Sequence, residues 1–113
     1  MINEWLDKFK NGWLNRDIDR ILGIFDEHVE YWETPNKKVD FANLKNEWQA
    51  IQSQDSINLD LSVYSSHANR YTVKWKLSYN DQQATQQNWS GIYLVELDNK
   101  NKCTYFYQTG EKI

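Results

Sequence analysis

The large aromatic side chains constrain the fold of this chain more than any other feature. Six tryptophans, seven tyrosines and four phenylalanines occur among its 113 residues. Many of them share one face of an expected element, as Trp5, Phe9 and Trp13 do at intervals of four residues. A chain of this length cannot bury so many rings in a dry core. We therefore expect some of the rings to line a concave surface, which is how small-molecule pockets are usually built.

Composition argues against several classes of function. The chain carries 13 basic and 16 acidic residues, and its formal net charge is −3. Nucleic-acid binding needs a clustered basic surface, which this sequence lacks. No stretch approaches the roughly 20 apolar residues of a membrane span, and the first residues show no signal-peptide pattern. The single cysteine, Cys103, allows no internal disulfide. We expect a cytoplasmic protein, one domain over residues 1–113, that binds neither nucleic acid nor membrane.

Helical periodicity is confined to the first half of the chain. Apolar residues recur there at intervals of three and four, and Asn or Asp stands where N-caps are expected. The pattern predicts a helix over residues 3–14, a helix from Asp17 to about Phe25, a strand over residues 29–34 and a helix from Asp40 to about Gln52.

Alternation of apolar and polar residues dominates the second half. It predicts strands over residues 57–63, 71–79, about 85–97 and 102–108. Gly91 indicates a bulge or a sharp bend. Beyond Gly91, apolar residues occupy both alternating sets of positions, so both faces of the sheet should be covered there. Helices early and strands late indicate an α+β fold of order α-α-β-α-β-β-β-β. We expect a curved antiparallel sheet wrapped around three helices as a cone, with a cavity at its open end.

Three passages of the chain resemble the nuclear transport factor 2-like superfamily, which includes SnoaL-type polyketide cyclases and ketosteroid isomerases. They are the polar turn and helix start Asn15–Leu22, the passage Phe25–Pro35, and Gly91–Asp98 followed by residues 102–112. The resemblance implies a conical α+β fold, a pocket between the helices and the concave sheet face, and homodimers formed through the sheet. It implies no single activity, because members include enzymes, binding domains and partners of larger proteins.

The residues of ketosteroid isomerase chemistry are not matched. In that family the base is an acid directly before a proline after the first strand, and here Thr34 precedes Pro35. Glu33 should face away from the pocket if Thr34 faces it, although a bulge would reverse this orientation. The family's donor tyrosine falls on Phe9, and the nearest counterpart of its protonated acid is Tyr93. These departures favour a binding role over catalysis.

Other enzymes of the superfamily use an acid or a histidine for proton transfer. His28 and Glu30 share strand parity and are the candidates for a catalytic base here, unless they belong to a solvated turn. Cys103, His28 and His67 lack the spacing of a ligand set, so we expect no metal, and no cofactor motif is present.

Inward parity and aromatic character together predict a ligand-binding set. It comprises Phe9, Trp13, Trp32, Thr34, Trp48, Trp75, Trp89, Tyr93 and Tyr107. Such rings could instead form the core or a dimer surface, and Tyr64 and Phe106 fit the dimer surface. The sequence thus predicts a pocket for a small, partly apolar organic molecule. The alternatives are a lyase, cyclase or isomerase with an acid/base residue in the cone, and a protein-interaction module with a filled cavity.

Overall fold

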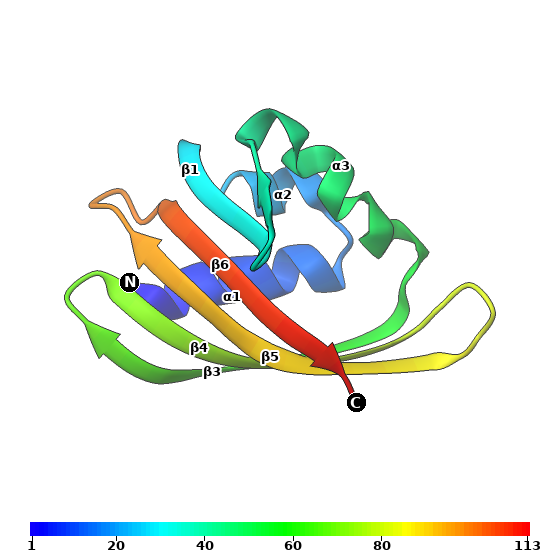
Figure 1. Cartoon of the computed structure of the whole chain (residues 1–113). Helices are drawn as coiled ribbons and strands as arrows, with labels where there is room; N and C mark the ends of the chain where they lie inside the picture. Colours follow the sequence, from blue (N-terminus) through cyan, green and yellow to red (C-terminus); the bar gives the residue numbers. More distant parts are fainter.

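A computed structural model describes residues 1–113. The elements, in order, are α1 (Ile2–Leu14), α2 (Ile18–Leu22), β1 (Phe25–Thr34), β2 (Lys37–Val39), η1 (Phe41–Asn43), α3 (Leu44–Trp48), η2 (Gln49–Ser53), β3 (Asp55–His67), β4 (Arg70–Asn80), β5 (Gln86–Leu97) and β6 (Cys103–Lys112). The strands curve around α1, and α3 lies above the sheet on the side away from the N-terminus (Figure 1).

One six-stranded sheet has the order β2-β1-β6-β5-β4-β3. The expected α+β class and curved sheet are confirmed, but the sheet is mixed rather than antiparallel. The parallel pair is β1 and β6, with Tyr31 opposite Phe106, while every other neighbouring pair is antiparallel. Parallel neighbours need a long connection, and here it consists of everything between β1 and β6. The first and last strands of the chain therefore meet in the middle of the sheet.

The helices follow from short sequence signals. One face of α1 buries Trp5, Phe9 and Trp13, as their spacing predicts. The side chain of Asp17 accepts a hydrogen bond from the backbone N–H of Arg20 (3.2 Å) and caps α2. The second helix is shorter than expected because β1 already begins at Phe25, and the third is a single short α-helix between two 3₁₀ segments. This broken helix lies above the sheet (Figure 1).

A pair of glycines shapes the sheet beside the site. The register of β5 with both neighbours is unbroken at Gly91, so the expected bulge is absent. Gly91 faces Gly110 on β6, and a Cβ atom added to Gly91 would lie 1.9 Å from the backbone oxygen of Thr109. A Cβ atom on Gly110 would lie 2.4 Å from the ring of Trp75. The two glycines therefore allow β5 and β6 to approach closely and leave room for the Trp75 indole.

The core is dominated by aromatic rings beneath α1. Phe106 stacks on Tyr31, with ring centroids 4.9 Å apart, and also contacts Phe9 and Tyr93. On β4 the alternation predicted from sequence is confirmed, because Val73 and Trp75 are buried and Lys74 between them is exposed. The cluster of rings continues from Phe106 through Tyr93 to Trp75 on β4.

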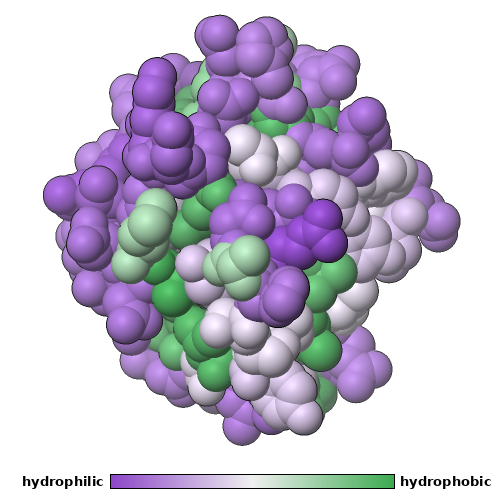
Figure 2. Space-filling view, turned by 90° about the vertical axis from the view of Figure 1, so that its left-hand side faces the viewer, coloured by the Kyte–Doolittle hydropathy of each residue, from purple (hydrophilic) through white to green (hydrophobic).

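The outer sheet face is less covered than the sequence predicts. Ile92 and Leu94 on β5 are 40% and 38% exposed, so a single chain does not cover both faces beyond Gly91. Figure 2 shows the side of the molecule that carries the N-terminus and the β3–β4 and β5–β6 turns; hydrophobic and near-neutral residues gather toward its middle, with hydrophilic residues around them. None of the helices combines the length and the apolar character that crossing a membrane requires.

Candidate functional site

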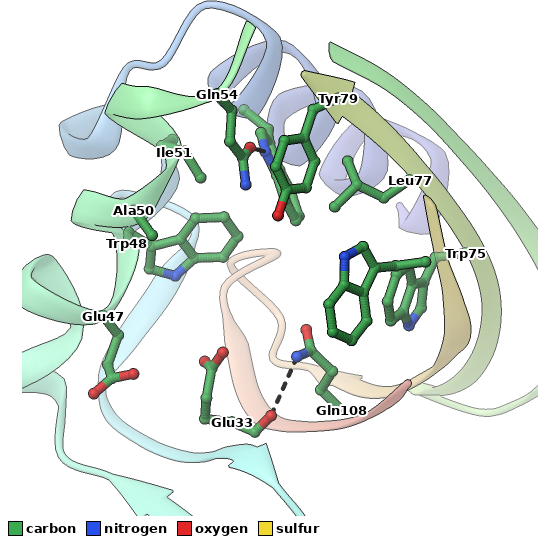
Figure 3. Close-up of a pocket in the computed structure, with 12 residues that line it drawn as sticks. Glu33, Glu47, Trp48, Ala50, Ile51, Gln54, Trp75, Leu77, Tyr79 and Gln108 are labelled. Carbon is green, nitrogen blue, oxygen red and sulfur yellow. Dashed lines mark hydrogen bonds between the residues drawn. The ribbon is translucent and has the colours of Figure 1, made fainter. Parts of the chain in front are cut away.

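A cavity of about 260 Å³ lies between the α3–η2 segment and the concave face of the sheet. Its lining residues are Trp13, Glu33, Glu47, Trp48, Ala50, Ile51, Gln54, Trp75, Leu77, Tyr79, Trp89 and Gln108. Figure 3 shows Trp48 and Trp75 on opposite sides of the hollow, with the side chains of Glu33 and Gln108 along a third side. The cavity is thus an aromatic chamber with a few polar groups, as in many small-molecule sites.

Trp13 and Gln54 form the inner polar corner of the cavity. The indole N–H of Trp13 donates to Oε1 of Gln54 (2.8 Å), and the ring of Trp13 packs edge-on against Trp48 at 4.9 Å. The Arg16 guanidinium donates to the backbone oxygen of Gln54 (2.9 Å). These contacts hold the Gln54 side chain in a fixed orientation, and its amide is the one buried polar side chain of the chain.

Two other indole N–H groups around the cavity have no hydrogen-bond partner. They belong to Trp75 on β4 and Trp89 on β5, and their nitrogen atoms are shielded from solvent, whereas the indole of Trp48 on α3 is hydrogen-bonded to Tyr31. Trp75 is only 6% exposed. A buried donor without a partner costs about 1–3 kcal/mol. A bound molecule with acceptor atoms would remove this penalty.

Two carboxyl groups supply the charge at the cavity. Burial, and secondly the nearby Glu47 carboxylate, raise the pKa of Glu33 above its ordinary value. Glu47 forms an ion pair with Lys37 (Nζ to Oε1, 2.9 Å), which raises the pKa of that lysine. Burial and the charge of Glu33 raise the pKa of Tyr31, which is buried beside it on β1. Glu33 therefore takes up a proton at a higher pH than an ordinary glutamate does.

Strand geometry explains why Glu33 faces inward. Tyr31 and Glu33 have the same parity on β1, and Tyr31 is buried in the core. The side-chain amide of Gln108 on β6 donates to the backbone oxygen of Glu33 (3.1 Å) and fixes this end of β1. The register of β1 against β2 shifts between Trp32 and Thr34. Glu33 therefore faces the cavity and Thr34 does not, which is the orientation that a bulge on this strand was expected to produce.

Four of the aromatic residues predicted from sequence line the cavity: Trp13, Trp48, Trp75 and Trp89. Two others lie one layer behind its wall. Phe9 packs edge-on against Trp48 (5.6 Å), and Tyr93 stacks on Trp75 (5.4 Å). Both are completely buried, so they support the wall and do not border the cavity.

The other three predicted residues, Trp32, Thr34 and Tyr107, do not border the cavity. The indole N–H of Trp32 donates to the exposed carboxylate of Glu30 (2.8 Å), and its ring lies 6.4 Å from that of Tyr107 on the outer face. The hydroxyl of Thr34 accepts a hydrogen bond from the backbone N–H of Asn36 (3.2 Å) at an exposed turn. The inward faces of β1 and β6 are offset by one residue from those that the sequence predicts, and such an offset moves every side chain of a strand to the other face.

The two candidate bases from sequence also lie elsewhere. The side chain of His28 is 85% exposed and near Glu27, and Glu30 is exposed on the outer side of β1. Neither residue lines the cavity, which corrects their assignment as bases for a molecule bound there. The acidic residue of β1 that lines the cavity is Glu33. Its spacing of two residues from Tyr31 is the sequence feature that places both side chains on the same face of the strand. No group of three or more His, Cys, Asp or Glu side chains lies close enough together to hold a metal ion.

Comparisons with known proteins identify the fold. No protein-family model and no curated protein sequence matches the chain. Among solved structures, an NTF2-like protein of unknown function from Exiguobacterium sp. 255-15 matches with a TM-score of 0.76 and 11% identity, over 97% of each chain. This chain has the NTF2-like fold.

An isomerase and a ligand complex are also among the solved structures that share the NTF2-like fold with this chain. A Δ5-3-ketosteroid isomerase from Mycobacterium sp. matches with a TM-score of 0.80 and 9% identity, over 97% of this chain and 96% of the isomerase. A Mycobacterium tuberculosis protein in complex with estradiol-17beta-hemisuccinate matches with a TM-score of 0.76 and 9% identity, over 92% of this chain and 88% of that one. Identities this low establish the fold alone.

Proposed function

We propose that this protein binds a small, partly apolar organic molecule in the cavity. The observation that carries the proposal is the pair of buried, unpaired indole N–H groups of Trp75 and Trp89 beside one hollow. A residue selected only for packing needs no polar atom at such a position, because phenylalanine or leucine would fill the space without the penalty. Donors without partners beside an empty space fit a ligand that supplies acceptors.

The size of the cavity restricts the ligand. Ligand pockets usually enclose roughly 300–1,000 Å³, and this cavity encloses about 260 Å³. A molecule of one or two rings fits such a space better than a steroid does. The mycobacterial protein that was solved with a steroid ester supports ligand binding within this fold, and the smaller ligand is proposed for this chain alone. The presence of the cavity speaks against an interaction module whose cavity is filled.

A compound screen with a blocking variant tests the proposal. Ala50 lies at the cavity on η2 and is exposed, so Ala50→Phe should fill the entrance without disturbing the core. The matched control is Gln49→Phe, an exposed neighbour that does not line the cavity. A ligand at a hundred times its dissociation constant stabilises the folded state by about 2.7 kcal/mol. We expect thermal shifts for wild type and Gln49→Phe and none for Ala50→Phe. Equal shifts in all three proteins would refute binding in the cavity.

Glu33 supports a second candidate function, proton transfer by a general base. Its carboxyl faces an aromatic cavity and its pKa is raised, which are features of tuned catalytic acids and bases. The probe is 5-nitrobenzisoxazole, which reports proton abstraction by a positioned carboxylate. A rate that rises with pH in wild type and disappears in Glu33→Gln would support catalysis. A rate in wild type no higher than in Glu33→Gln would exclude it for this probe.

We also propose that two copies pair through the outer sheet face. Leu94 on β5 lies opposite Tyr107 on β6, and Tyr107 lies opposite Trp32 on β1, so apolar side chains form a continuous stripe. Tyr64 is exposed on β3, but Phe106, which was expected on the dimer surface, is completely buried in the core. Aromatic and aliphatic residues exposed in this way are typical of homodimer surfaces.

A further inference from the structure

We propose that the molecule bound in this cavity is an organic cation, an amine that also carries an oxygen acceptor. This inference rests on the proposed binding function and narrows it to one ligand class. The two charged side chains that line the cavity are both acidic, Glu33 and Glu47, and no lysine, arginine or histidine is among the lining residues. The cavity therefore presents negative charge without an internal positive partner.

The basic residue nearest to these carboxylates is already engaged. Lys37 is paired with Glu47 at 2.9 Å, and its side chain is 56% exposed on the outer side of that carboxylate. Burial and the Glu47 charge both raise the pKa of Glu33, and the Tyr31 hydroxyl and the Lys37 charge offset them only in part. A cation in the cavity would compensate Glu33 directly. An anionic ligand would instead be repelled by two carboxylates in a partly desolvated site.

The aromatic walls also favour positive charge. Trp13, Trp48, Trp75, Trp89 and Tyr79 surround the space. The face of an aromatic ring is electronegative, and cages of such rings with nearby carboxylates are suited to ammonium groups. A neutral apolar ligand would gain from the rings but would bring no positive charge to the half-buried Glu33 carboxylate.

The indole N–H groups define the other end of the ligand. Only 6% of the surface of Trp75 is exposed, and its indole N–H has no hydrogen-bond partner. An ammonium group has no acceptor to offer this donor, whereas an ether, hydroxyl or carbonyl oxygen does. Glu33 and Glu47 lie on the side of the cavity away from Leu77 and Tyr79 (Figure 3). The fitting molecule is therefore polarised, with its amine toward the carboxylates and its oxygen among the rings.

Three probes of one shape separate the ligand classes. They are 2-phenoxyethylamine, 2-phenoxyethanol and phenoxyacetate, which share a ring and an ether oxygen and differ only in terminal charge. Calorimetric titration is carried out at mildly alkaline pH, because a higher pH favours the carboxylate form of Glu33 while the amine remains protonated. We expect the amine to bind at least about tenfold more tightly than the alcohol, and phenoxyacetate to bind most weakly. Equal or tighter binding of the alcohol or the acid would overturn the cation proposal and leave binding in the cavity intact.

Substitutions test whether the Glu33 carboxylate causes the preference for the amine over the alcohol. Glu33→Gln keeps the side-chain shape and should lower amine affinity about tenfold while leaving alcohol affinity unchanged. Glu30→Gln, on the outer side of the same strand, is the matched control and should change neither. Lys37→Met should tighten amine binding, because it removes the competing positive charge from Glu47. An unchanged amine preference in Glu33→Gln would overturn the proposal. Absence of binding by all three probes would also overturn it, and a silent compound screen would then reject the binding function itself.

Discussion

The unpaired indole of Trp75 gives a prediction that can be worked through because Trp5 is a matched control. Both side chains are buried. The N–H of Trp5 donates to the backbone oxygen of Ile24 (3.0 Å), whereas the N–H of Trp75 has no partner. A Trp→Phe substitution removes the same atoms at both positions, so the loss of packing is similar and largely cancels when the two variants are compared.

The hydrogen-bonding terms do not cancel. Trp5→Phe loses one hydrogen bond worth about 1 kcal/mol, and the Ile24 oxygen keeps the Cys103 backbone N–H (2.8 Å) as a partner. Trp75→Phe removes a donor whose burial without a partner costs about 1–3 kcal/mol. Trp5→Phe should therefore destabilise the ligand-free protein by about 2–4 kcal/mol more than Trp75→Phe does.

Urea denaturation of the two variants and wild type measures this difference directly, provided that the slopes with denaturant agree. Equal destabilisation by the two substitutions would mean that the Trp75 N–H is already satisfied in the free protein. That outcome would refute the reasoning from unpaired donors, on which the proposed binding function depends.

Three further predictions concern charge, backbone and assembly. Burial and the Glu47 charge raise the pKa of Glu33 in the folded protein, so ionisation of Glu33 destabilises the fold as pH rises from the unfolded pKa through the folded pKa and has no effect below both. Glu33→Gln should therefore stabilise the free protein near pH 8 but not near pH 3. Denaturation curves at about these two pH values measure the difference. Gly91→Ala should destabilise by more than about 3 kcal/mol because its Cβ atom would overlap the backbone of β6, whereas Gly23→Ala, with its nearest neighbour at 3.4 Å, should change the unfolding free energy by less than about 1 kcal/mol; similar values would contradict the close strand approach. Leu94→Lys should convert a dimer into a monomer in sedimentation analysis, and a wild-type chain that sediments as a monomer at high concentration would reject pairing through this face.

The sequence predicts the fold where a pattern is long and uninterrupted. On β4, apolar or aromatic residues alternate with polar residues over the full strand, so the buried face containing Val73 and Trp75 follows from parity alone. On β1 and β6, aromatic residues occupy consecutive positions, as in Tyr31-Trp32 and Phe106-Tyr107, and parity cannot decide which ring faces the core. The parallel pairing of β1 with β6 depends on contacts between distant segments, which local periodicity does not encode.

The residues that line the cavity can likewise be predicted only where the sequence pattern is clear. Trp48 and Trp75 lie on clearly amphipathic elements, and both line the cavity as their patterns indicate. The polar lining residues are different, because Glu33, Gln54 and Gln108 are inward-facing side chains that hydrophobicity patterns place in solvent. Gln54 is held by a hydrogen bond from Trp13, and Gln108 holds the backbone of Glu33, so their positions become visible only once the chain is folded.

A crystal structure of the protein soaked with 2-phenoxyethylamine tests the central claim most directly. The account predicts density for the compound between Trp48 and Trp75, with its amine near Glu33 and its oxygen within hydrogen-bond distance of an indole nitrogen. A cavity that is closed by collapse of these rings, or a compound bound only elsewhere on the surface, would contradict it.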